Sequence, residues 1–330
     1  MARTAVIQSA CELTIWFGRN GMARSDQQPQ RSDTRLVWND LWSEFSSQAP
    51  GRMRRREGAT TCPFCADLTS GRVGPEVQAW IRPNDFPAFT PPTGECSILI
   101  YSRDHDRRFA DLSPDETLRV VELWRQVYDD LSRRYICVMS WETSGAEIGQ
   151  TQTHPHGQTY GVSIIPELLQ REMESILRAE RKGQLCPFCA SVACEQAGSR
   201  LVFAGQWWIA FVPPWARYPY QTQIVPRQHF SAMDGLESDG EAARELATLL
   251  PRLIRAYDRI MQAPMPYMLA LHQLADLRFH FHIELLPVGR APGKLKLPAS
   301  AEMAWGLWLN DALPESAAAQ LRELLAEDAR

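Results

Sequence analysis

The sequence predicts an α+β fold built from two tandem repeats, in which an antiparallel-rich sheet carries packed helices. The first observation is a Cys-Pro-Phe-Cys-Ala motif that begins at Cys62 and recurs from Cys186. The second is that His105 recurs as His229 at the same offset. The third is that each half contains short apolar, β-branched segments around one long amphipathic segment. Features that keep this register indicate an internal duplication.

In the first half, a long helix is expected to begin at Pro114. Ser113 and Glu116 form a capping box around it, proline is favoured at the first helical position, and apolar residues follow at helical spacing to Leu131. Apolar and β-branched composition predicts strands over 77–81, 97–102 and 135–141.

The second half repeats this order of elements. Strands are expected over 209–212, 221–225 and 267–271, with a helix over about 241–260. A helix over roughly 166–182 joins the halves, and another begins near Pro314. The predicted domains are an N-terminal segment over 1–57 that is partly disordered, a first half over 58–183 and a second half over 184–330.

Composition excludes several classes of protein. The 330 residues are 45% hydrophobic, enough for a substantial core, and the net charge of −4 comes without long runs of one sign. Nucleic acid is therefore not an expected partner. No apolar run reaches the length of a membrane helix, and no secretory signal is recognisable. Paired Cys-x-x-Cys motifs suit a metal better than a disulfide framework, so a cytoplasmic protein is expected.

The first candidate site is a metal centre. Cys62 and Cys65 can present two thiolates to one ion, and His105 and His154 can complete a tetrahedral Cys₂His₂ set. Four protein ligands leave no open position, so the predicted zinc is structural. The alternative is a buried, reduced cysteine pair beside unrelated histidines. The repeat proposes a second set, Cys186, Cys189, His229 and His280.

The second candidate site is the segment His154-Pro155-His156-Gly157-Gln158. In an extended chain its histidines and Gln158 project to one face, and Pro155 and Gly157 suggest a strand end beside a site. A neutral imidazole at His156 is a good nucleophile toward phosphorus, and the Gln158 amide can donate to a phosphoryl oxygen. A pair of metal ligands or of packed histidines is the alternative interpretation.

This motif, preceded by a Cys-x-x-Cys and an Asp-His, resembles the signature of galactose-1-phosphate uridylyltransferases, a branch of the histidine-triad superfamily. The resemblance extends from about Cys62 to Glu302. It includes Asn84-Asp85-Phe86, Trp141-Glu142, Val212-Pro213-Pro214-Trp215-Ala216, Val225-Pro226-Arg227-Gln228-His229 and His280-Phe281-His282. The two repeats are then expected to be histidine-triad-like.

The resemblance implies a ping-pong nucleotidyl transferase. His156 takes the uridylyl group of a UDP-hexose, and a second hexose 1-phosphate accepts it. The zinc ligands of the family map onto Cys62, Cys65, His105 and His154. The implied substrate contacts are Gln158, Thr151, Glu142, Lys296 and Glu302. The family commonly forms homodimers whose sites borrow residues from the partner chain.

Where family members carry a second ion, the resemblance implies Glu172, His272, His280 and His282, whereas the repeat favours the cysteine-containing set given above. The sequence also departs from the family pattern around the substrate pocket, at Thr143, Gln150, Gln152, Thr153 and Trp308. The arginines that hold the diphosphate have no clear counterpart, and Arg52 and Arg55 are candidates to replace them. A related transferase or phosphorylase with another base or acceptor, such as an ADP-sugar with phosphate, is therefore one alternative. A silent zinc scaffold is the other.

Overall fold

The computed structural model describes residues 34–41, 43–54 and 61–328. The predicted disorder before residue 34 and the candidate Arg55 lie outside these residues. Within the described part of the chain, no helix combines the length and the apolar character that are needed to cross a bilayer.

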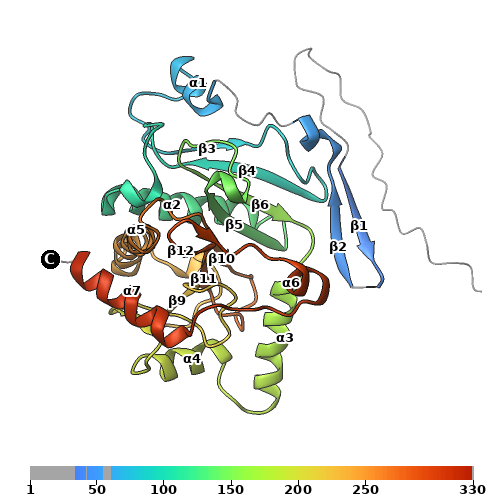
Figure 1. The fold of residues 1–330 in the computed structure, drawn as a ribbon. Coiled ribbons are helices and arrows are strands. Elements are labelled where there is room, and N and C mark those ends of the chain that lie inside the picture. Colours follow the sequence, from blue (N-terminus) through green and yellow to red (C-terminus); the bar gives the residue numbers. More distant parts are fainter. Residues whose placement is uncertain (1–33, 42, 55–60, 329–330) are drawn as a thin grey trace, which may run out of the picture.

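One antiparallel sheet of nine strands runs through both halves of the chain, in the order β3-β4-β6-β5-β10-β11-β9-β8-β7 (Figure 1). Its strands are β3 (Trp80–Pro83), β4 (Gly94–Ile100), β5 (Cys137–Ser144), β6 (His156–Val162), β7 (Leu201–Ala204), β8 (Trp208–Phe211), β9 (Thr222–Pro226), β10 (Tyr267–His272) and β11 (His282–Pro287). The pairing of β5 with β10 joins the halves, so the repeats share a sheet. The predicted α+β class and antiparallel sheet are confirmed.

The two long helices cover one face of this sheet. They are α2 (Pro114–Leu131) and α5 (Glu241–Met261), which pack against each other, while α7 (Pro314–Asp328) packs on α5. The capping box of α2 forms as predicted, because the Glu116 amide donates to Ser113 Oγ and the Glu116 carboxylate accepts from the Ser113 amide. The largest apolar core of the protein lies between these helices and the sheet.

Shorter elements cover the opposite face. They are α1 (Pro63–Thr69), α3 (Glu167–Arg181) and α4 (Pro187–Glu195), with smaller apolar clusters beneath them. The N-terminal hairpin of β1 (Arg35–Asn39) and β2 (Glu44–Gln48) leads into the short helix η1 (Pro50–Arg54) beside this face (Figure 1). The remaining elements are η2 (Phe109–Asp111), η3 (Ala146–Ile148), η4 (Met233–Gly235), β12 (Gly289–Ala291), β13 (Lys294–Leu295) and α6 (Ser300–Trp305).

The predicted helices agree with the structure to within about two residues, whereas two central strands were not predicted. Strand β6 begins at His156 and β11 at His282, each two residues after a histidine of a candidate metal group. Proline and glycine around His156 argue against a strand locally. Pairing with β4 on one side and β5 on the other nevertheless keeps this segment extended.

Candidate active site and metal centres

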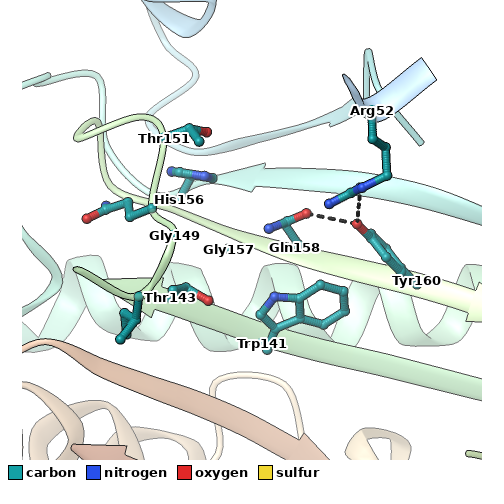
Figure 2. A pocket seen from close by; sticks show the side chains of 11 residues that line it. Arg52, Trp141, Thr143, Gly149, Thr151, His156, Gly157, Gln158 and Tyr160 are labelled. Atoms are coloured by element: carbon teal, nitrogen blue, oxygen red, sulfur yellow. Dashed lines mark hydrogen bonds between the residues drawn. The ribbon is translucent and has the colours of Figure 1, made fainter. Parts of the chain in front are cut away.

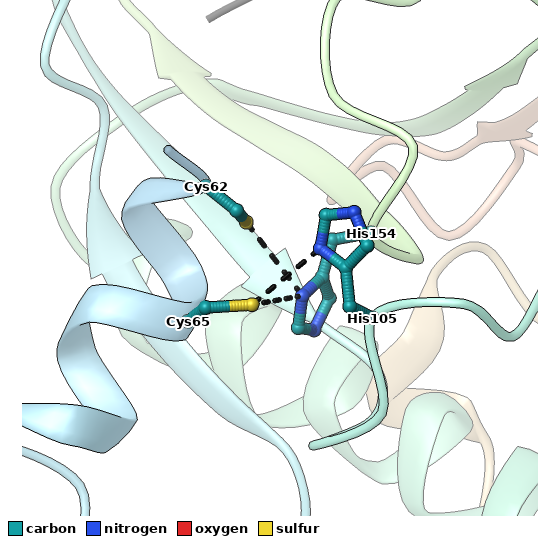
Figure 3. Close-up of side chains that lie close together, drawn as sticks. All are labelled: Cys62, Cys65, His105 and His154. Atoms are coloured by element: carbon teal, nitrogen blue, oxygen red, sulfur yellow. Dashed lines mark hydrogen bonds between the residues drawn. The ribbon is translucent and has the colours of Figure 1, made fainter. Parts of the chain in front are cut away.

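The four residues of the first predicted metal site lie close together at the N-terminus of α1 (Figure 3). Cys62 precedes the helix and Cys65 lies in its first turn, so both thiols point the same way. His154 Nδ1 lies 3.7 Å from Cys62 Sγ and 3.6 Å from Cys65 Sγ. His105 Nδ1 lies 3.4 Å from Cys65 Sγ. These are the four residues that the sequence analysis named.

This group fits a zinc ion. A tetrahedral zinc holds a thiolate sulfur and an imidazole nitrogen about 3.5 Å apart, which is the spacing seen here. His154 Nε2 donates to the backbone carbonyl of Ser102 at 2.7 Å, so its Nδ1 carries the lone pair that a metal needs. Burial and the neighbouring Cys62 raise the pKa of the Cys65 thiol to about 11. The Cys65 thiol therefore needs a cation beside it to ionise at neutral pH.

The second half repeats this group with Cys186, Cys189, His229 and His280. His280 Nδ1 lies 3.8 Å and 3.5 Å from the two sulfurs, and His229 Nδ1 lies 3.4 Å from Cys189 Sγ. His280 Nε2 donates to the carbonyl of Pro226 at 3.2 Å, as His154 does to Ser102. Burial lowers the pKa of His280 to about 4, which keeps the ring neutral as a metal ligand.

The alternative second set does not come together as four residues, because His280 faces the cysteines. Glu172, His272 and His282 form a third group of their own. His272 Nδ1 lies 2.9 Å from the Glu172 carboxylate, whose other neighbour, His282 Nε2, is 3.8 Å away and has no hydrogen-bond partner among the described residues. Burial opposes ionisation of Glu172, yet the two imidazoles lower its pKa to about 2.

His156 stands at the start of β6, two residues after the ligand-type His154. Its Nδ1 donates to the backbone carbonyl of His154 at 2.8 Å. Since a neutral imidazole carries one proton, the Nε2 atom keeps a lone pair. The ring packs 5.1 Å from that of Phe64 on α1, next to the cysteine pair. The backbone therefore sets the tautomer of the His156 ring.

A pocket of about 580 Å³, which includes space open to solvent, lies in front of His156 (Figure 2). Strand β6 contributes His156, Gln158 and Tyr160, and β5 contributes Trp141 and Thr143 from the same face. The other lining residues are Arg52, Ile148, Gly149, Gln150, Thr151 and Gly157. Of the predicted substrate contacts, the structure thus brings Arg52, Thr151 and Gln158 together with His156.

Three other predicted substrate contacts lie away from this pocket. Lys296 and Glu302 are both buried and pair with each other, Nζ to Oε1, at 2.7 Å. Glu142 projects from β5 to the opposite face from Trp141 and Thr143, because neighbouring strand residues alternate. These three side chains therefore do not line the pocket beside His156 within a single chain.

Glu142 instead belongs to the core between the halves. It is 4% exposed, and Tyr267 Oη on β10 donates to its Oε1 at 2.7 Å. Its Oε2 has no hydrogen-bond partner within the described part of the chain. Desolvation raises the pKa of Glu142 to about 8, although the Tyr267 bond opposes this, so the folded protein holds it protonated at neutral pH.

The Glu142→Gln variant is expected to become more stable relative to the parent protein as pH rises. Between the unfolded pKa of 4.5 and the folded pKa of about 8, only the unfolded chain ionises this carboxyl. The parent's free energy of unfolding then falls by up to about 1.4 kcal/mol per pH unit from this group, and glutamine removes that dependence. Denaturant unfolding from mildly acidic to mildly alkaline pH measures the difference. Parallel pH profiles would contradict the assignment.

The sequence analysis missed the aromatic members of the pocket, Trp141 and Tyr160. Tyr160 follows Gln158 by two residues, so the alternation of a strand indicates that both face the same way. Trp141 pairs directly with Gln158 across β5 and β6, and its ring lies 4.4 Å from that of Tyr160, edge to face. The strand period could have found Tyr160, whereas the register that selects Trp141 is a tertiary property.

The chain matches a known protein family along most of its length. The family model for the N-terminal domain of galactose-1-phosphate uridyl transferase matches residues 75–166, and that for its C-terminal domain matches residues 189–329. A galactose-1-phosphate uridylyltransferase of Thermotoga maritima is 32% identical over 322 residues, which cover 88% of this chain and 99% of the relative. One from Streptomyces lividans is 32% identical over 308 residues, which cover 84% and 83%.

Solved structures agree with the sequence comparison. A uridylyltransferase structure matches with a TM-score of 0.81 and 25% identity, covering 89% of this chain and 99% of the other. An ADP-glucose phosphorylase from Arabidopsis thaliana with bound ADP-glucose matches with a TM-score of 0.70 and 18% identity, covering 88% and 99%. The second likeness concerns the fold alone.

Proposed function

The chain belongs to the galactose-1-phosphate uridylyltransferase family, and from this premise we propose that it moves a uridylyl group from a UDP-hexose to a hexose 1-phosphate. The reaction proceeds in two displacements on one nucleophile, His156. The observation that carries the proposal is the hydrogen bond from His156 Nδ1 to the His154 carbonyl, which leaves Nε2 as the nucleophilic atom at the pocket.

In the first displacement, His156 Nε2 attacks the α-phosphorus of the UDP-hexose. A phosphorus–nitrogen bond forms and the bond to the hexose 1-phosphate oxygen breaks, so that the electron pair leaves with the sugar phosphate. The imidazole gains positive charge, and the carbonyl of His154 stabilises it through the Nδ1 proton. In the second displacement, a phosphate oxygen of the acceptor attacks the same phosphorus and releases the imidazole.

Three polar side chains are proposed to hold the phosphates. Gln158 lies on the same strand face as His156 and supplies an amide donor to the α-phosphoryl oxygen. Thr151, on the loop before the motif, and Arg52, on η1, line the same pocket and are the candidate contacts for the remaining phosphate oxygens. Arg52 thus brings the N-terminal segment to the reaction.

The Cys₂His₂ groups are proposed to hold structural zinc ions, with Cys62, Cys65, His105 and His154 as the first site. Such an ion would fix the His154 ring, and through it the carbonyl that orients His156. Cys186, Cys189, His229 and His280 are the candidate second site, and β5 and β10 separate β11, which follows His280, from β6. When bound, zinc supplies rigidity here, while the residues of β6 carry the chemistry.

The natural base and acceptor are the open part of this proposal. Thr143 and Gln150 stand at pocket positions where the sequence departs from the family pattern, and Gln150 Oε1 accepts from the Gly145 amide at 2.7 Å, so that it braces its own loop. These changes favour a second candidate, transfer of another nucleotidyl group such as that of an ADP-sugar, through the same His156 adduct.

Intact-protein mass after incubation with UDP-glucose or ADP-glucose separates these possibilities. We expect the purified protein to gain the mass of one uridylyl group from UDP-glucose and to lose it when hexose 1-phosphate is added. An adenylyl gain alone would replace the base in the proposal. A protein that gains neither mass would support a silent scaffold and overturn the proposed enzyme.

The enzyme is further proposed to be a cytoplasmic homodimer in which the segment around α6 contributes to the partner's site. The buried Lys296–Glu302 pair lies outside this chain's own pocket, and the exposed Met303, Trp305 and Leu307 beside it form an apolar surface. Light scattering at the assay concentration is expected to give the dimer mass. A fully active monomer would contradict this arrangement.

A further inference from the structure

A short hydrogen-bond relay on the pocket face of β6 bears on how Gln158 works, and so rests on the proposed function. His156, Gln158 and Tyr160 occupy alternate positions on this strand (Figure 2). The Tyr160 hydroxyl donates to Gln158 Oε1 at 3.0 Å. Asn84 Nδ2 donates to the same oxygen at 3.4 Å. Two donors therefore converge on one end of the Gln158 amide.

Neighbouring groups whose hydrogen-bonding role is fixed agree with the direction of both bonds. A guanidinium can only donate, and Arg52 Nη1 lies 3.5 Å from the Tyr160 oxygen. That oxygen accepts from Arg52, and the hydroxyl donates to Gln158 Oε1. On the other side, the backbone amide of Phe86 donates to Asn84 Oδ1 at 2.9 Å, which assigns Nδ2 to the end of Asn84 that meets Gln158. Since an amide nitrogen only donates, the atom of Gln158 that meets Asn84 Nδ2 is its oxygen.

The consequence for the pocket concerns the other end of the amide. Gln158 Nε2 points away from Tyr160, on the side where His156 stands (Figure 2). With the amide reversed, an oxygen would face the phosphoryl oxygens and repel them as charge builds in the transition state. We propose that Tyr160 is a positioning residue that, with Arg52 behind it, holds the Gln158 amide with its donor toward the α-phosphate.

The packing of Tyr160 explains how its hydroxyl stays in place. The side chain is 5% exposed, and its ring meets Trp141 edge to face at 4.4 Å and Phe89 at 6.0 Å. These contacts involve the ring alone, so phenylalanine keeps them and loses only the hydroxyl. Tyr220 offers a matched control, because its hydroxyl donates to Gln320 Oε1 at the same 3.0 Å, at a partly exposed site on the C-terminal helix α7.

The experiment is a double-mutant cycle on the full chain with UDP-glucose. Single-turnover formation of the uridylyl-enzyme is measured for the parent, Tyr160→Phe, Gln158→Ala and the double variant, with Tyr220→Phe as control. We expect Tyr160→Phe to slow the step about tenfold, the scale of one lost hydrogen bond, with little change in the Kd for UDP-glucose. In the Gln158→Ala background the same change should cost less than about twofold, because its target is gone.

The outcomes are distinguishable from one another. A parent protein that forms no uridylyl adduct overturns the proposed function, and this inference with it. An active parent with an unaffected Tyr160→Phe variant overturns the inference alone. Losses that multiply in the double variant would do the same, because they would mean that the hydroxyl acts on substrate or on stability independently of Gln158. An equal loss in Tyr220→Phe would also contradict a specific role for Tyr160.

Discussion

His156→Ala is expected to abolish uridylyl transfer, with a rate of adduct formation at least about 10⁴-fold below that of the parent protein. The reason is that a two-step transfer through one covalent intermediate has no route without its nucleophile. The hydrogen bond from His156 Nδ1 to the His154 carbonyl places the lone pair on Nε2, and alanine removes that atom. Intact mass and a coupled assay for the released sugar phosphate measure both steps.

Two controls distinguish loss of the nucleophile from loss of folding or of metal. The His156→Ala protein should keep the metal content and the melting temperature of the parent, since His156 is not a member of any candidate metal group among the described residues. The His156→Gly variant leaves a space the size of the imidazole ring. Free imidazole added to the solution is therefore expected to take the place of the side chain and to accept the uridylyl group. A His156→Ala protein that still takes up the uridylyl group would place the nucleophile elsewhere and end this mechanism.

Cys62→Ser is expected to lower zinc content by one ion per chain and the free energy of unfolding by on the order of 3 kcal/mol or more. The physical reason is that the first group ties α1, the loop after β4 and the start of β6 together through side chains far apart in sequence. Transfer should fall as well, because His154 then loses the contact that holds its ring while its carbonyl orients His156. Metal analysis and denaturant unfolding measure the two quantities.

Cys194→Ser is the matched control for this prediction. Cys194 is an exposed free cysteine outside every candidate metal group among the described residues, so the same atomic change should leave zinc and stability at parent values. Cys186→Ser, at the equivalent position of the second group, is expected to remove the other ion while leaving adduct formation close to the parent rate. A Cys62→Ser protein with full zinc content and unchanged stability would contradict the assigned ligands.

Local chemistry made much of the fold predictable. The capping box at Ser113 and the helical spacing behind it predict α2 without reference to the rest of the chain, and α5 follows from the same spacing. Strand β6 could not be predicted in this way. A Cβ at Gly157 would lie 1.9 Å from Oη of Tyr101, the residue that follows β4. Glycine is therefore required at this position by a tertiary contact.

The candidate site was likewise predictable from the sequence only in part. The repeated Cys-x-x-Cys motif and the histidines in register with it predict both Cys₂His₂ sets from their spacing. The His-Pro-His-Gly-Gln segment predicts His156 as the nucleophile through its resemblance to the family signature. Three features depend on strand register and on neighbours up to 125 residues away in sequence. They are the metal group that contains His280, the face of β5 that carries Glu142 and the orientation of the Gln158 amide. These contacts depend on which residues become neighbours in the folded sheet, and the spacing of residues along the sequence does not reveal that.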